Sequence, residues 1–163
     1  MKIVLVEPEI PQNTGNIGRT CAALGVQLNL IEPLGFSLEE KMVKRAGLDY
    51  WHLIDYARYP SFSAFLEANP GTPLFFLSTK GAKVYTEVSY PADCALVFGR
   101  ESAGLPEELL QAHPERCVRI PMREEARSMN LANSVAIAAF EVMRQNNFPG
   151  LLREGSPRTF SWS

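Results

Sequence analysis

The chain has 163 residues, of which 46% are hydrophobic and 21% charged, and its formal net charge is −2. This length and composition predict one globular domain, and no apolar run approaches the roughly 20 residues needed to cross a bilayer. The opening run, residues 1–6, is too short for a signal peptide, so we expect a cytoplasmic protein with no membrane partner. The slightly negative charge argues against nucleic-acid binding by bulk electrostatics, so any such binding must rest on particular arginines.

The cysteines and histidines form neither a disulfide pattern nor a metal pattern. Three cysteines lie far apart in apolar segments, where buried thiols are expected: Cys21, Cys94 and Cys117. The two histidines, His52 and His113, have no metal-ligand spacing relative to them. We therefore expect no zinc or iron site.

The first half of the chain predicts strands that alternate with helices. Continuous apolar runs at 3–6 and 27–31 are typical of strands buried on both faces of a parallel sheet. Between them, two prolines at 8 and 11 predict a loop, and a helix follows from about residue 13. Its apolar residues share one face and it ends at Gly25. Two glycines in its first turn, Gly15 and Gly18, indicate close approach of a neighbouring segment or of a ligand.

The next predicted elements are a basic helix, a short strand and a second helix. A capping box at 37–40 opens a basic helix that ends at Gly47, and its charges form a solvated face or contact RNA: Lys41, Lys44 and Arg45. Residues 52–55 are expected to form a short strand, and Ser61 to begin a helix.

The second half continues the alternation. Strands are expected at 74–77, 95–98 and 118–120, a short helix from Pro106 to about residue 112, and a closing helix at 131–145. From Gly150 onward the chain is expected to be a loosely attached tail, in which Phe160 and Trp162 could dock elsewhere. The alternation predicts an α/β protein with a mostly parallel sheet and helices on both faces.

Unusual polar loops follow three of the predicted strands, after Leu77, Phe98 and Ile120. Ligands of open α/β sheets bind at such strand ends. The dinucleotide fingerprint, the Walker A sequence and the nucleophile elbow are all absent, which disfavours hydride transfer, nucleotide hydrolysis and acyl transfer. The remaining polar set at the strand ends and in the first helix suits a reaction that depends on positioning. Its members are Asn13, Asn16, Arg19, Arg100, Glu101, Ser128, Asn130 and Asn133.

The start of the closing helix is open to two interpretations. Ser128, Asn130 and Asn133 surround its first turn, where backbone N–H groups lack partners. Such an opening is either a well-capped core helix or a site for a polar ligand or an RNA phosphate.

Three motifs along the chain stand in the order and spacing of a known family. They are Asn13-x-Gly15-Asn16-x-Gly18-Arg19-Thr20, Phe98-Gly99-Arg100-Glu101-x-x-Gly104-Leu105-Pro106, and Ile120-Pro121-Met122 with Ser128-Met129-Asn130-Leu131-Ala132-Asn133. In these motifs the chain resembles the SPOUT RNA methyltransferases that methylate ribose 2′-hydroxyls. Two further runs, at 7–11 and 45–50, resemble the minimal branch that acts on the wobble cytidine or uridine of tRNA. The similarity covers residues 1–150, expected as one domain, with 151–163 as a C-terminal tail.

The resemblance implies a fold, a cofactor and partners. The fold is an α/β knot, in which the last helix is threaded through a loop as a C-terminal trefoil knot, and the protein is a homodimer. S-adenosylmethionine is bound by the loops around Leu77, Gly99, Ile120 and Ser128, with S-adenosylhomocysteine as the product and no metal. Met122 and Leu131 extend the apolar wall for that ligand. The implied substrate is position 34, a cytidine or modified uridine, in leucine-type tRNA anticodons.

The resemblance also suggests roles for particular residues. Arg19 is implied to assist loss of the ribose proton, with the RNA phosphate as helper. Because a guanidinium does not ordinarily act as a base, we expect Arg19 to bind phosphate and stabilise the developing alkoxide. The alternative is a surface arginine beside a helix start.

Two further catalytic candidates each have a structural alternative. Glu101 is expected to orient Arg19 or its own loop, or else to cap a helix. Asn130 is expected to position the ribose, or else to cap the last helix. The expected phosphate contacts are Arg100, Arg123 and Arg127, each of which could instead be a solvated charge.

One residue departs from the family pattern, and other functions stay open. Phe140-Glu141 stands where many relatives have Tyr-Glu, so a role for that hydroxyl is lost while packing by the ring is kept. The alternatives are a non-catalytic RNA-binding knot protein and a SPOUT enzyme that acts at another tRNA or rRNA position. A small-molecule nucleotide enzyme is disfavoured by the missing phosphate loops.

Overall fold

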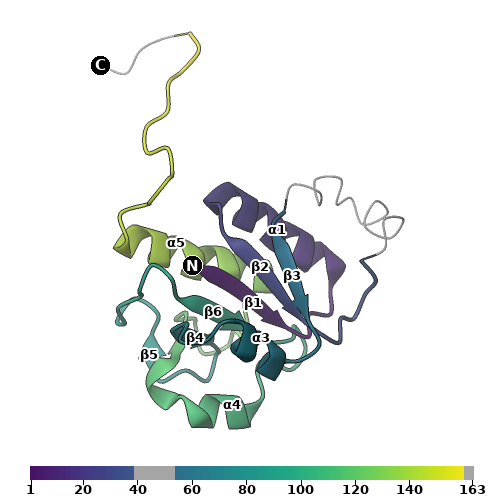
Figure 1. The fold of residues 1–163 in the computed structure, drawn as a ribbon. Coiled ribbons are helices and arrows are strands. Elements are labelled where there is room, and N and C mark those ends of the chain that lie inside the picture. Colours follow the sequence, from purple (N-terminus) through teal and green to yellow (C-terminus); the bar gives the residue numbers. More distant parts are fainter. Residues whose placement is uncertain (39–53, 160–163) are drawn as a thin grey trace.

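A computed structural model describes residues 1–38 and 54–159, and in this part of the chain seven strands form one sheet (Figure 1). The strand order is β3-β2-β1-β6-β4-β7-β5, and every neighbouring pair is parallel. The strands are β1 (Lys2–Val6), β2 (Gln27–Ile31), β3 (Tyr56–Tyr59), β4 (Leu74–Leu77), β5 (Lys83–Val84), β6 (Ala95–Phe98) and β7 (Cys117–Arg119). The predicted parallel α/β architecture is confirmed.

Helices cover both faces of the sheet, as the apolar strands require. Helices α1 (Pro11–Leu24) and α5 (Leu131–Gln145) pack on one face, where Ile3 and Leu5 of β1 meet them. Helix α3 (Phe62–Ala68) and helix α4 (Glu107–Ala112) pack on the other, against Val4 and Val6. A 3-10 turn at Pro114–Arg116 leads into β7. Alternate residues of one strand therefore enter two separate apolar clusters, which explains the continuous apolar runs.

Helix α1 begins two residues earlier than predicted, at Pro11. The proline that was expected to prolong the loop is instead at the first helical position, where its missing N–H costs nothing. The helix ends at Gly25 in the left-handed conformation, with φ 64°. The close approach expected at Gly18 belongs to a neighbouring segment, because a Cβ there would lie 2.2 Å from Cδ1 of Ile54.

The sheet edges differ most from the sequence predictions. The strand expected at 52–55 does not include Ile54 and Asp55, while residues 52 and 53 lie outside the described residues. The strand in this region occupies Tyr56–Tyr59 and is half exposed at the edge beside β2. The two-residue strand β5 was not predicted. Strand β7 begins at Cys117 and ends before Ile120. Pro106 lies at the N-cap position of α4, one residue before the first helical position that was predicted for it. The basic helix expected from 37 to 47, with its lysines and Arg45, and His52 lie largely or wholly outside the described residues.

Helix α5 has the predicted bounds, and Asn130 caps it. The Asn130 side-chain oxygen accepts hydrogen bonds from the backbone N–H groups of Ala132 at 2.9 Å and Asn133 at 3.3 Å. Beyond the helix, residues 151–159 form neither helix nor strand, Leu152 is 94% exposed, and the tail extends away from the body (Figure 1). The proposed docking of Phe160 and Trp162 falls outside the described residues.

The three cysteines are buried free thiols, as predicted. Burial raises the pKa of the Cys21 thiol to about 12 and that of the Cys94 thiol to about 11. Both therefore remain protonated and unreactive at neutral pH. Across residues 1–38 and 54–159, no helix is long and apolar enough to span a bilayer.

Candidate functional site

The three polar loops meet at one edge of the sheet. Strands β6, β4 and β7 are consecutive neighbours in the sheet, so the residues that follow Phe98, Leu77 and Arg119 emerge side by side. Between these loops and the starts of α1 and α5 lies a cavity of about 550 Å³. That volume is within the range of small-molecule sites, which is roughly 300–1,000 Å³.

Most of the predicted site residues line this cavity. All four residues expected to hold a cofactor do so, namely Leu77, Gly99, Ile120 and Ser128. So do two of the catalytic candidates and two of the expected phosphate contacts: Glu101, Asn130, Arg100 and Arg127. The other two candidates, Arg19 and Arg123, are exposed and are not among the residues that line it.

The cavity wall combines apolar side chains with closely packed backbone. Leu77, Ile120, Met122 and Leu131 supply apolar surface. Gly99 lies against the loop it begins, since a Cβ on Gly99 would stand 2.0 Å from the carbonyl carbon of Gly104. Glycine is therefore required at this position by the packing of the loop on itself.

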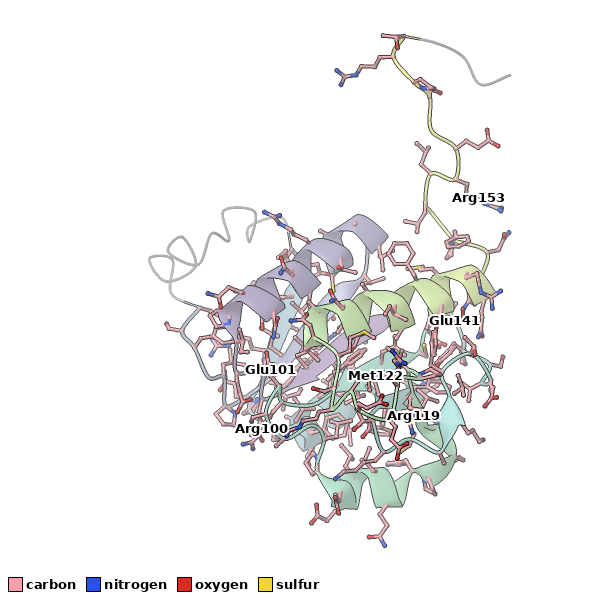
Figure 2. The ribbon with its side chains drawn as sticks, turned by 180° about the vertical axis from the view of Figure 1, so that it is seen from behind. Arg100, Glu101, Arg119, Met122, Glu141 and Arg153 are labelled. Carbon is pink, nitrogen blue, oxygen red and sulfur yellow. The ribbon has the colours of Figure 1, made fainter. Side chains whose placement is uncertain are left out.

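Glu101 joins the loop after β6 to the start of α1. Its carboxylate accepts hydrogen bonds from the backbone N–H groups of Glu9 at 2.8 Å and Ile10 at 3.2 Å, and from Nδ2 of Asn13 at 3.1 Å. Figure 2 labels Glu101 and its neighbour Arg100. Helix α1 has no side-chain cap of its own at Ile10. Glu101 therefore holds two loops together and supplies acceptors to the start of a helix.

Asn13 extends this network to the third loop. Its Oδ1 atom accepts a hydrogen bond from Nδ2 of Asn130 at 2.9 Å, while Asn130 caps α5 with its own oxygen. Asn13 is only 7% exposed, so both of its polar atoms are held in place. A continuous chain of hydrogen bonds thus runs from Glu101 through Asn13 and Asn130 to α5, and fixes the three motifs relative to one another.

Arg100 and Arg127 bring positive charge to the cavity wall, whereas Arg19 and Arg123 lie outside it. Arg100 forms an ion pair with Glu7, whose backbone has the unusual φ of 51°. Arg127 lines the cavity, and Arg19 lies on the exposed face of α1. Arg123 lies in the exposed loop between β7 and α5. Guanidinium groups at these places can bind phosphate, although Arg100 would then share its charge with Glu7.

Two further residues at the site were not among the predicted ones. Ser102 lines the cavity, and Glu9 binds it through two hydrogen bonds. The sequence offered one signal, a carboxylate at position 9 between two prolines, in a loop that faces a predicted ligand site. Its partner lies more than 90 residues away, so no local pattern indicates the pairing.

The chemistry available here suits a ligand that is partly apolar and partly polar. The apolar wall can hold a ring or a thioether, and the amide, hydroxyl and backbone groups on the rim can hold polar atoms. Among the described residues, no three His, Cys, Asp or Glu side chains are grouped so as to hold a metal ion.

Comparisons with known proteins agree with this geometry. Residues 1–140 match the model of the SpoU rRNA Methylase family. The chain is 51% identical over 155 residues to a tRNA (cytidine(34)-2'-O)-methyltransferase from Aeromonas hydrophila, and the match covers 94% of this chain and 99% of that protein.

Two solved structures show the same fold. A structure that describes the 2-OH methylation of C/U34 on tRNA has a TM-score of 0.83 at 49% identity, with 90% of this chain and 95% of that chain covered. The SpoU methyltransferase AviRb from Streptomyces viridochromogenes, in complex with the cofactor AdoMet, has a TM-score of 0.74 at 26% identity, with 90% and 60% covered.

Proposed function

The chain belongs to the SpoU rRNA methylase family, and on this premise we propose that it transfers a methyl group from S-adenosylmethionine to the ribose 2′-hydroxyl of the tRNA wobble nucleotide. The expected nucleotide is position 34, a cytidine or modified uridine, in leucine-type anticodons. The observation that carries the proposal is the cavity at the ends of β4, β6 and β7, built from the three family motifs. The high identity to tRNA (cytidine(34)-2'-O)-methyltransferases along almost the whole chain supports the choice of substrate.

The residues present fit S-adenosylmethionine. The apolar wall formed by Leu77, Ile120, Met122 and Leu131 suits the adenine ring and the methionine chain of that molecule. Gly99 lines the same cavity, so its backbone groups are available to that molecule. Ser128 and Asn130 lie on the same wall and can hold its polar groups.

The chain's own residues would prepare the acceptor. When bound, S-adenosylmethionine supplies a sulfonium methyl group, which passes in line to the ribose oxygen and leaves S-adenosylhomocysteine. Arg19 stabilises the negative charge that develops on this oxygen as its proton leaves to the RNA phosphate or to water. Arg100, Arg123 and Arg127 bind phosphates and orient the nucleotide, while Glu101 and Asn130 hold the loops that frame it.

The proposal includes a homodimer that works in the cytoplasm and carries the trefoil knot of its family. Phe140 is 48% exposed on α5, and the half-buried Ile137 lies on the same helix, so α5 presents apolar surface that a second chain can cover. The phenyl ring would pack in that interface without the hydroxyl found in many relatives. We expect sedimentation velocity to show two chains per particle, and single chains at micromolar concentration would contradict the dimer.

Label transfer tests the proposed reaction. Purified protein is incubated with S-adenosylmethionine carrying a labelled methyl group and with unmodified tRNA transcripts that differ at position 34. We expect label in leucine-type tRNA, and none in a transcript whose anticodon loop is deleted. Binding of tRNA without transfer would favour a non-catalytic RNA-binding protein. Transfer to rRNA or to another tRNA position would identify a family member with a different target.

A further inference from the structure

Beside the cavity, two segments that are far apart in the sequence are joined by two carboxylates, and each segment supplies the carboxylate that the other binds. The Glu9 carboxylate accepts hydrogen bonds from the backbone N–H of Ser102 at 2.9 Å and from its hydroxyl at 2.8 Å. In return, the Glu101 carboxylate accepts the N–H groups of Glu9 and Ile10. We call this reciprocal arrangement of Glu9, Ile10, Glu101 and Ser102 the carboxylate clasp.

The clasp depends on Glu9 being ionised. The two hydrogen bonds from Ser102, first that of its side chain and then that of its backbone, lower the pKa of the Glu9 carboxyl below its ordinary value. Glu9 is therefore a carboxylate at neutral pH. Hydrogen bonds to an ionised acceptor are about twice as strong as those between neutral groups.

The tip of the 99–104 loop depends on Glu9 for its position. At the base of the loop, Arg100 and Gly104 exchange two backbone hydrogen bonds, of 2.9 and 3.2 Å, and this pair closes the turn. Ser102 lies at the tip between them and is exposed. Its hydroxyl and its N–H both donate to Glu9, so this carboxylate ties the tip to the segment that precedes α1.

The two ends of the clasp differ in how they relate to the cavity. Ser102 and its neighbours from Gly99 to Leu105 line it, whereas Glu9 is not among the lining residues. We therefore expect the Glu9 carboxylate to affect a ligand in the cavity through the loop that it holds.

We propose that Glu9 is a positioning residue, whose carboxylate holds the tip of the 99–104 loop where it completes the cofactor cavity. It thereby sets the affinity for S-adenosylmethionine and not the rate of methyl transfer. The identity of this ligand rests on the proposed function. If loss of the clasp leaves the loop correctly placed in about one molecule in ten, the apparent dissociation constant rises about tenfold.

The test combines a structural readout with a binding readout. Glu9→Gln leaves one acceptor oxygen for the Ser102 N–H and places an NH2 group against the Ser102 hydroxyl, so the ionised acceptor that strengthens both hydrogen bonds is lost. Ser102→Ala removes one of the two donors and is expected to have a smaller effect. Glu67→Gln is the matched control, because it removes the same charge from the exposed surface of α3 on the opposite face of the sheet.

Hydrogen exchange at the Ser102 amide, followed by NMR on the ligand-free protein, reports the clasp itself. We expect faster exchange in Glu9→Gln, and exchange as in the wild type in Glu67→Gln. Calorimetry without RNA should show S-adenosylmethionine binding weakened about tenfold in Glu9→Gln, and kcat at saturating cofactor should be unchanged.

Four outcomes separate the possible failures. Unchanged Ser102 exchange in Glu9→Gln would overturn the clasp. Faster exchange with cofactor affinity within twofold of the wild type, or a loss of kcat with affinity retained, would overturn the positioning role. A wild-type protein that binds no S-adenosylmethionine would overturn the proposed function and the ligand part of this inference, while Ser102 exchange would still decide whether the clasp exists.

Discussion

Replacing Arg19 with alanine is expected to lower kcat/KM for tRNA methylation about 100- to 1,000-fold, the usual effect of removing one preorganised group that stabilises developing charge. Arg19 is exposed on α1 and is not among the residues that line the cavity, so its contribution should lie with the RNA and not with the cofactor. Single-turnover methylation of tRNA measures the loss. Calorimetry with S-adenosylmethionine should give the same affinity as the wild type.

One further variant separates the charge of Arg19 from its shape, and a second serves as a control. Arg19→Lys keeps the positive charge but loses the planar fork, and we expect it to recover part of the activity. Arg58→Ala removes a guanidinium that pairs with Glu32 at the far edge of the sheet, and should leave activity close to that of the wild type. Full activity of a folded Arg19→Ala protein would remove the role assigned to this residue.

Replacing Gly99 with alanine is expected to abolish cofactor binding and to lower the free energy of unfolding by about 1–3 kcal/mol or more. The added Cβ would lie 2.0 Å from the carbonyl carbon of Gly104 and 2.2 Å from the backbone nitrogen of Leu105. Both atoms belong to the backbone, so no side-chain rotation relieves the clash, and the loop that lines the cavity must open.

Chemical unfolding and calorimetry with S-adenosylmethionine measure the two effects of Gly99→Ala. The control is Gly155→Ala in the C-terminal tail, where a Cβ meets no atom within 4 Å and neither quantity should change. Wild-type affinity for the cofactor in Gly99→Ala would show that the loop tolerates a side chain at this position, and the close packing described here would then be wrong.

The central part of the fold could be predicted from the sequence because its strands are apolar on both faces. Strands β1, β2, β4 and β6 stand out as continuous apolar runs, and each was placed within one residue. The edge strands carry no such signal. Strand β3 alternates in exposure and begins at Tyr56, and β5 has two residues, too few for any period to appear.

The candidate site was predictable in its parts but not in its assembly. Polar loops after Leu77, Phe98 and Ile120 indicated strand-end chemistry, yet hydrophobic periodicity does not encode the order β6-β4-β7 that makes these loops neighbours. The resemblance to a known family supplied the expectation that the three motifs act together. The hydrogen bond from Asn130 to Asn13 and the pairing of Glu9 with Ser102 join residues separated by 117 and 93 positions. Only the folded chain brings such groups together.

The methylated atom can be located directly on the RNA. Purified protein is incubated with S-adenosylmethionine and a tRNA transcript that has cytidine at position 34, and nuclease fragments of the product are read by mass spectrometry. A matched RNA carries 2′-deoxycytidine at that position and so lacks the acceptor oxygen. We predict a methyl group on the ribose of nucleotide 34 in the first RNA and none in the second. A methyl group on a base, on another nucleotide or on the deoxy substrate would contradict transfer to the wobble 2′-hydroxyl.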